Sequence, residues 1–283
     1  GCAVAVATFG CEYLWGESPI FELCPESCGE CDSNVTVYNK AILPGWNWFS
    51  LNVLDEDMST DNVLGSLTST GGDFLKTPSA TSEYYEEFGW YGSLEQLGVT
   101  GMYMLRSANA DNLIFSGESV DPATTPIDIE AGWNWIGYTP QHDGQIGDAL
   151  ETIIASDQDF IKTSTSTAEY YDGFGWYGSL EIMSPTDGYM LNVAESSELI
   201  YPDFEADDAL TREIVEKELP VSISDWEVDY HDYEFNGTIT LSIDNHEDRS
   251  DDYIAVYVGD ECRGIAEYRD FPFDNVERGI YIM

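Results

Sequence analysis

Basic residues are scarce in this 283-residue chain, which has 10 Lys and Arg against 54 Asp and Glu and a formal net charge of -44. A surface with this charge repels phosphate backbones and anionic lipids. The sequence also lacks any apolar run approaching the roughly 20 residues needed to span a bilayer. We therefore expect no nucleic-acid partner and no membrane insertion.

Motifs for catalysis are missing as well. The sequence contains no nucleophile elbow, zinc-protease helix, phosphate loop or dinucleotide fingerprint, and it has only three histidines. Carboxylate pairs occur throughout so acidic a chain, and their proximity therefore does not indicate a catalytic site. The expectation is a non-catalytic protein without an organic cofactor.

Cysteine is confined almost entirely to the first 31 residues. Such density is typical of a small disulfide-stapled unit in an oxidising compartment, which predicts a domain over 1–33 and a secreted protein. A zinc site is the competing interpretation, although no histidine lies nearby. The predicted disulfide cysteines are Cys2, Cys11, Cys24, Cys28, Cys31 and Cys262.

The string CPESCGEC, from Cys24, resembles the close of small cysteine-rich ShK-like toxin domains and their relatives in secreted algal proteins. The resemblance implies six cysteines, whereas this segment has five. The missing partner is then either upstream of Gly1, which we favour, or Cys262. The other interpretations of Cys262 are a buried free thiol and an interchain link. The start at Gly1 without a signal segment also favours a processed chain or part of a longer one.

An internal repeat organises the middle of the chain. GWNWFSLNV from Gly45 returns as GWNWIGYTP from Gly132, and EYYEEFGWYGSLE from Glu83 returns as EYYDGFGWYGSLE from Glu169, an offset of 86 or 87 residues. DFLKT and DFIKT recur between these anchors in the same order. The pattern predicts two homologous modules over 43–117 and 130–201, joined by a proline-containing connection.

Each module shows the pattern of a β-rich α+β fold. Apolar residues in the GWNW segment are typical of a strand, and Ser59 or Thr60 is a candidate cap for a short helix. The helix of the second module is expected over Ile146–Ile154. Short strands punctuated by glycines follow in both modules. The fold class is therefore predicted to be β-rich α+β, built from tandem small modules.

The order GWNW, DFIKT, EYY..FGWYGSLE and YML resembles a repeated segment of large secreted proteins from marine microalgae and bacteria. The resemblance covers more than half of the chain. It implies an extracellular protein and no enzymatic role.

The carboxy-terminal segment, 219–283, changes to alternating strands. YIAVYVG from Tyr253 and CRGIAEY from Cys262 each have period two, and Gly259-Asp260 predicts a tight hairpin turn. The string GDECRG resembles a β-sandwich module common in secreted multidomain proteins. We expect an incomplete sandwich whose open strand edge can pair with another chain.

Several residues are candidates for sites. Two sequons, at Asn34 and Asn236, permit N-glycosylation. The stretch DNHEDRSDD offers oxygen ligands of the kind that Ca²⁺ prefers, although a solvated acidic turn is the competing interpretation. The candidate Ca²⁺ ligands are Asp244, Glu247, Asp248, Asp251 and Asp252.

Aromatic and basic residues recur at equivalent positions of the two modules. The aromatic motif predicts either core packing or an exposed platform for sugars or a partner. The candidate contacts are Trp90, Tyr91, Trp176 and Tyr177. Lys76 and Lys162 are expected to pair with a carboxylate inside their own module, such as Glu83 or Glu169.

Together these features predict a non-catalytic, secreted structural protein that self-assembles in an extracellular filament, appendage, matrix or cell wall. Its expected partners are copies of itself or other matrix proteins, because repetition amplifies weak contacts. The alternative is a carbohydrate-binding adhesin with an aromatic platform on each module, whose partners would be glycans.

Overall fold

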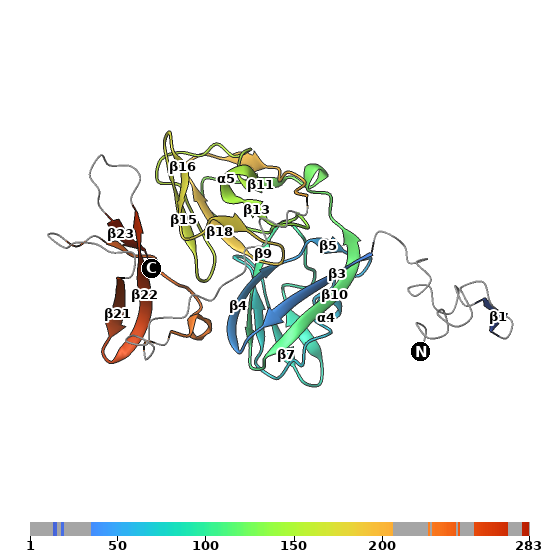
Figure 1. Cartoon of the computed structure of the whole chain (residues 1–283). Helices are drawn as coiled ribbons and strands as arrows, with labels where there is room; N and C mark the ends of the chain where they lie inside the picture. The colour runs from blue at the N-terminus through green and yellow to red at the C-terminus, as the bar shows by residue number, and fades with distance from the viewer. Residues whose placement is uncertain are drawn as a thin grey trace.

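The structure is a computed structural model that describes residues 14–15, 18–19, 35–205, 226, 228–241, 243, 252–270 and 279–282. It is β-rich and built from several antiparallel sheets, as the sequence predicts. Figure 1 shows the two modules, here called repeat 1 and repeat 2, packed together with a carboxy-terminal sheet on one side. Within the described residues, no helix combines the length and apolar character needed to cross a membrane.

Each repeat contains the same five-stranded antiparallel sheet. In repeat 1 the strand order is β4 (Gly45–Ser50), β9 (Met102–Ser107), β6 (Phe74–Lys76), β7 (Thr81–Tyr85) and β8 (Gly89–Gly92). In repeat 2 it is β12 (Gly132–Ile136), β18 (Tyr189–Val193), β14 (Phe160–Lys162), β15 (Thr167–Tyr171) and β16 (Gly175–Gly178). The identical order shows that the repeated sequence encodes a repeated fold.

A smaller sheet accompanies each five-stranded sheet. In repeat 1 it comprises β3 (Val35–Ile42), β10 (Asp111–Ser119) and β5 (Val53–Leu54), and in repeat 2 β11 (Ile127–Ile129) and β19 (Ser197–Leu199). A two-stranded sheet of β13 (Gly144–Gln145) and β17 (Ile182–Met183) completes repeat 2, and η1 (Pro122–Thr124) lies between the repeats. Tyr38 and Ile42 on β3 are buried in the core of repeat 1, which therefore begins before residue 43.

Both repeats contain one short helix. Helix α4 spans Thr60–Val63, and the Ser59 hydroxyl accepts a hydrogen bond from the Asn62 amide at 3.3 Å, as expected of a cap. Helix α5 spans Ile146–Ala149 and lacks a side-chain cap. The prediction that it continues to Ile154 was wrong: the helix ends at Leu150, and the amides of Glu151 and Ile153 instead bond to the carbonyls three residues earlier, those of Asp148 and Leu150.

Asparagine explains the repeated GWN motif. Gly45 has a φ of +96°, which only glycine adopts without strain, and it turns the chain from β3 into β4. The Asn47 side chain then accepts a hydrogen bond from the Leu43 amide at 2.9 Å and donates to the Leu43 carbonyl at 2.7 Å. Asn134 makes the same pair of bonds with Glu130. Each repeat therefore fixes its first turn with one amide side chain.

The aspartate of the DF(L/I)KT motif is a second internal clamp. Asp73 is buried, and its carboxylate accepts hydrogen bonds from the Thr70 and Ala108 amides, each at 2.8 Å. Asp159 is buried likewise and accepts from Ser156 and Ala194, also at 2.8 Å. These carboxylates join the turn before β6 or β14 to the end of the neighbouring strand, and this explains their recurrence without a chemical role.

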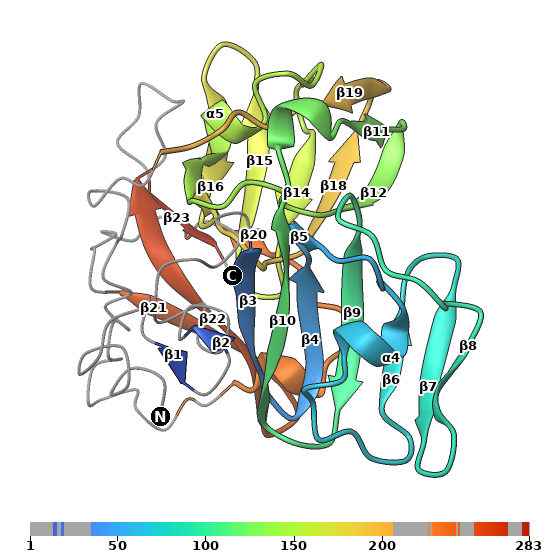
Figure 2. The ribbon, with the colours of Figure 1, turned by 90° about the vertical axis from the view of Figure 1, so that its right-hand side faces the viewer.

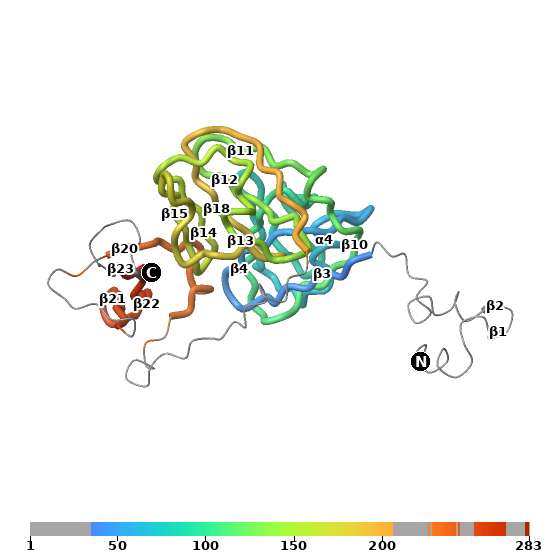
Figure 3. Tube along the Cα trace, turned by 45° about the horizontal axis from the view of Figure 1, so that its top comes forward, coloured from blue at the N-terminus to red at the C-terminus, as the bar shows by residue number. Residues whose placement is uncertain are grey.

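Each repeat has its own hydrophobic core. In repeat 1 the core includes Phe49, Leu105 and Leu75, which lie on the adjacent strands β4, β9 and β6. In repeat 2 the equivalent strands contribute Ile136, Ile161 and Leu191. Figure 3 shows the two repeats as separate windings of the chain that lie against each other. The two repeats therefore have separate cores and an interface between them.

Buried tyrosines predict sensitivity to alkaline pH. Burial raises the pKa of Tyr38, Tyr138, Tyr189 and Tyr201. In the unfolded chain each phenol ionises near pH 10, so above that pH the unfolded state loses protons that the folded state keeps. Stability is complete below about pH 10 and falls by up to about 1.4 kcal/mol per pH unit for each tyrosine above it.

Melting temperatures measured from about pH 8 to 12 test this prediction. Burial lowers the pKa of Lys162 from 10.5, so this lysine makes the free energy of unfolding increase as the pH rises toward 10.5. The four buried tyrosines act in the opposite direction and outweigh this single group. A melting temperature that stays constant across this range would show that the four phenols are not sequestered in the folded state.

The carboxy-terminal part forms one four-stranded antiparallel sheet. Its order is β20 (Thr240–Leu241), β23 (Gly279–Ile282), β22 (Glu261–Asp270) and β21 (Tyr253–Val258), and η3 (Tyr230–Asp232) precedes it. The hairpin turn predicted at Gly259 is present, with Val258 opposite Glu261. Among the described residues this is a single sheet, and it has no partner sheet of a sandwich. Near the amino terminus β1 (Leu14–Trp15) pairs with β2 (Ser18–Pro19).

Candidate functional site

The outer faces of the two five-stranded sheets meet in a tryptophan-rich junction. Trp48, Met102 and Met104 of repeat 1 form a buried cluster with Met190 of repeat 2, and Trp46 and Trp135 pack against it. Alternate residues of a strand face opposite sides of a sheet, so the tryptophans of each GWNW strand point away from the core of their own repeat. The motif therefore supplies the contact between repeats.

The junction is nearly symmetric. The Ser50 amide donates to the Thr186 carbonyl at 3.0 Å, and the Gly137 amide donates to the Thr100 carbonyl at 2.9 Å. These residues are equivalent in the two repeats, which means that each repeat presents the same strand end to the other. Such reciprocity is the mark of an isologous contact with an approximate two-fold axis.

The two recurring lysines lie in this junction. Nζ of Lys76 is 5.3 Å from the ring centroid of Trp46 and 5.7 Å from that of Trp135. Reciprocally, Nζ of Lys162 is 5.4 Å from the ring centroid of Trp133 and 5.8 Å from that of Trp48. Each lysine thus interacts with one tryptophan from each repeat at distances typical of cation–π contacts.

The expected pairing of these lysines inside their own module was wrong. Lys76 forms an ion pair with Glu234, and Lys162 donates to the Asn236 carbonyl at 2.9 Å. Glu83 lies opposite Phe74 on β6 and accepts a hydrogen bond from Tyr85. The lysine side chains instead reach across the sheet face toward the tryptophans, where the carboxy-terminal segment covers them.

The segment from His231 to Asn236 lies across the junction. Nδ1 of His231 hydrogen-bonds to the Trp46 carbonyl at 2.6 Å, and the Phe235 ring centroid is 4.6 Å from the Lys76 ammonium. The Asn236 side-chain amide donates to the Ser164 carbonyl. The carboxy-terminal part is therefore attached to both repeats through polar contacts.

The β7–β8 and β15–β16 hairpins carry the second concentration of aromatic residues. Trp90 is 8% exposed and packs edge-to-face on Tyr84 at 5.6 Å, whereas Tyr91 is 75% exposed and Phe88, in the turn, 80% exposed. The hairpin of repeat 1 therefore anchors one set of rings in the core and presents the other to solvent.

Repeat 2 reproduces this hairpin with its tryptophan less buried and its tyrosine more buried than in repeat 1. Trp176 packs edge-to-face on Tyr170 at 5.5 Å and contacts the core, and Tyr177 is partly buried. Phe174 remains 66% exposed. Figure 2 shows the two hairpins well apart, β7–β8 at the lower right and β15–β16 at the upper left. The chain thus presents two separated aromatic tips.

The other predicted sites fall mostly outside the described residues. These are Asn34, the five amino-terminal cysteines, and Asp244, Glu247, Asp248 and Asp251 of the candidate calcium loop. Of that loop only Asp252 is described, and its carboxylate accepts a hydrogen bond from Tyr281 at 3.5 Å. Cys262 is half-buried and its thiol contacts the Gly264 carbonyl at 3.7 Å, and it is the one cysteine among the described residues, so its pairing stays open.

Asn236 has a structural role that the sequon does not indicate. Its side-chain nitrogen, the atom to which a glycan would be attached, is the donor to Ser164, and the residue is half-buried. A glycan there would have to displace this contact. The tryptophan junction was also missed, although apolar residues on both faces of the GWNW strand are the signal that could have revealed it.

Comparison of the chain with known protein families, with curated proteins and with solved structures gives no match.

Proposed function

We propose that this protein is a non-catalytic, secreted structural protein that self-assembles in an extracellular filament, appendage, matrix or wall. The observation that carries the proposal is the display of the same aromatic hairpin tip twice, by two repeats joined through a buried junction. Phe88 and Phe174 mark the tips. Exposed aromatic rings at defined positions are common anchors of protein interfaces.

The junction between the repeats supports this proposal because it limits motion between the two tips. Buried methionines and tryptophans, two reciprocal hydrogen bonds and the two lysines all connect the repeats. A body with two fixed contact points joins two neighbours, so copies of the chain extend into a fibre or sheet. Two weak contacts held at a fixed spacing also bind more tightly than either alone.

Burial argues against the tryptophans of the aromatic motif as a sugar platform. Trp90 is buried, and Trp176 packs against the core of repeat 2. The exposed rings of the motif are Tyr85, Tyr91 and the phenylalanines of the turns. They lie on protruding hairpins and suit a protein partner. The occupant that we assign to the tips is a second copy of this chain.

The double substitution F88S/F174S tests this assignment. We expect the unchanged full chain to form concentration-dependent assemblies, visible by sedimentation velocity and electron microscopy. The variant should remain monomeric at the same concentrations, because both tips lose their exposed ring. Its stability should change little, since substitutions of exposed side chains usually alter stability by less than about 0.5 kcal/mol.

A matched control is the double substitution V37S/I114S. Val37 and Ile114 are exposed apolar residues on the outer face of the β3–β10 sheet, away from the hairpins. This variant should assemble as the unchanged chain does. Monomers of the unchanged chain at every concentration, or equal loss of assembly in both variants, would overturn the proposed function.

A further inference from the structure

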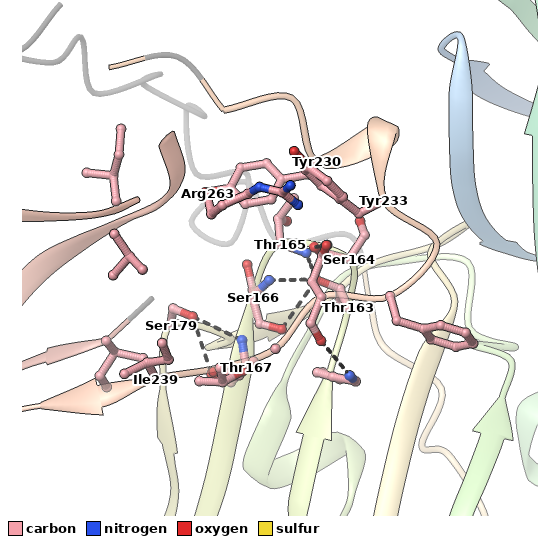
Figure 4. Close-up of a pocket in the computed structure, with 18 of the residues that line it drawn as sticks. Thr163, Ser164, Thr165, Ser166, Thr167, Ser179, Tyr230, Tyr233, Ile239 and Arg263 are labelled. Carbon is pink, nitrogen blue, oxygen red and sulfur yellow. Dashed lines mark hydrogen bonds between the residues drawn. The ribbon is translucent and has the colours of Figure 1, made fainter. Parts of the chain in front are cut away.

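A cavity of about 420 Å³ lies between repeat 2 and the carboxy-terminal sheet. One wall is the loop between β14 and β15, residues 163–166, together with Thr167 at the start of β15, and the opposite wall includes β22. Figure 4 shows the loop in the centre, with Arg263 beside Tyr230 and Tyr233 above it and Ser179 below. The volume is in the range of pockets that hold small ligands.

The loop on this wall carries more hydroxyl groups than the equivalent loop of repeat 1. Residues 78–80 of repeat 1 read Pro-Ser-Ala, whereas the equivalent residues 164–166 read Ser-Thr-Ser. The turn itself needs only the preceding threonine: the Thr163 hydroxyl accepts from the amides of Thr165 and Ser166, as Thr77 does in repeat 1. The added hydroxyls of repeat 2 are therefore not explained by the turn, and they line the cavity.

Basic side chains are concentrated here despite the acidity of the chain. Three of the six basic residues in the described part, Lys162, Arg263 and Arg269, line the cavity, together with one carboxylate, Glu267. Arg263 pairs with the exposed Glu261 at 2.8 Å, and Arg269 with Glu181 at 3.2 Å. A guanidinium has five N–H donors, so each arginine keeps capacity for another acceptor.

Aromatic and apolar side chains complete the walls. Tyr230 and Tyr233 lie on the η3 side, and the Arg263 guanidinium is 4.6 Å from the Tyr233 ring centroid. Ile239 and Ile265 form part of the lining near the sheet. Aromatic faces, hydroxyls and a cationic fork are the groups that recognise the C–H face, the hydroxyls and the acidic group of a charged sugar.

We propose that this cavity binds an anionic saccharide, one bearing carboxylate or sulfate groups. The acidic group lies against Arg263, the sugar ring stacks on a tyrosine, and its hydroxyls bond to the 164–166 loop. The site is independent of the aromatic tips that carry the proposed function. In an extracellular assembly it would attach the protein to an acidic polysaccharide.

Isothermal titration calorimetry on the full chain tests the proposal. The probes are an oligogalacturonate, a sulfated galactan oligomer of equal length, the neutral galactan oligomer and inorganic sulfate. We expect at least one anionic oligomer to bind at least about tenfold more tightly than both the neutral oligomer and sulfate. Whichever anionic oligomer binds more tightly shows whether the site prefers carboxylate or sulfate. Equal binding of the neutral oligomer or of sulfate, or no binding by either anionic oligomer, would overturn it.

Two variants locate the binding in the cavity. Arg263→Gln should weaken the binding of the anionic oligomer by about tenfold or more, because a charge-assisted hydrogen bond is lost. S164P/T165S/S166A transfers the loop of repeat 1, which already folds in this turn, and should weaken binding by several fold. Arg106→Gln, at an exposed arginine of repeat 1 that bonds to the Gly72 carbonyl, is the matched control and should leave affinity unchanged. Equal affinity of all three variants would place the binding elsewhere and refute the site.

Discussion

Replacement of Asp73 by alanine is expected to lower the free energy of unfolding by about 2 to 4 kcal/mol. Asp73 is 4% exposed, and its carboxylate accepts hydrogen bonds from the Thr70 and Ala108 amides. The substitution removes two charge-assisted hydrogen bonds and detaches the turn before β6 from the chain after β9. Urea denaturation of the full chain measures the change.

The second repeat supplies an internal check on this prediction. Asp159→Ala removes the same two bonds from the equivalent place and should cost a similar amount. Asp128→Ala, at an exposed position on β11, is the control and should change stability by less than about 0.5 kcal/mol. If the Asp73 and Asp128 variants proved equally stable, the clamp would be energetically unimportant.

Trp48→Ala is expected to cost about 3 to 5 kcal/mol, the range found for truncation of buried aromatic residues. The side chain lies in the junction, where it packs with the methionines of both repeats and faces Lys162. Because each repeat keeps its own core, the damage should fall on the coupling between repeats. In the unchanged chain the junction should make the two repeats unfold in one calorimetric transition. In the variant the repeats should unfold in two separate transitions.

Leu105→Ala is the control for Trp48→Ala. Leu105 is fully buried in the core of repeat 1 and lies on the opposite face of the sheet from the junction. It should destabilise repeat 1 by about 2 to 5 kcal/mol and leave the contact itself in place. A Trp48 variant that still unfolds in one transition of unchanged midpoint would show that the junction does not couple the repeats.

Local patterns predicted much of the fold. The repeat, the strand at GWNW, the Ser59 cap and the hairpin at Gly259 all depend on residues close together in sequence, and the structure contains each of them. The helix lengths and the start of repeat 1 were harder, because burial against distant strands decides where those elements end. Tyr38, for example, is fixed by the core of repeat 1 and not by its neighbours in sequence.

The junction and the cavity could not be predicted from local pattern. A recurring lysine in an acidic chain suggests a nearby carboxylate, but Lys76 pairs with Glu234, 158 residues away, and lies over a tryptophan of the other repeat. The sequence itself shows that residues 164–166 carry more hydroxyls than the equivalent residues of repeat 1. Their importance is apparent only when the sheet that packs opposite them is known. Such contacts between distant segments need the three-dimensional arrangement.

The reciprocal hydrogen bonds of the junction bear on how the two repeats stay associated. A contact between two equivalent surfaces is the geometry of a homodimer, and here both halves belong to one polypeptide. The pair therefore cannot dissociate on dilution, as two separate modules would. Fusion also allows the halves to differ, which a true homodimer forbids. One half keeps Pro78 in its turn, while the other carries the hydroxyls that face the carboxy-terminal sheet.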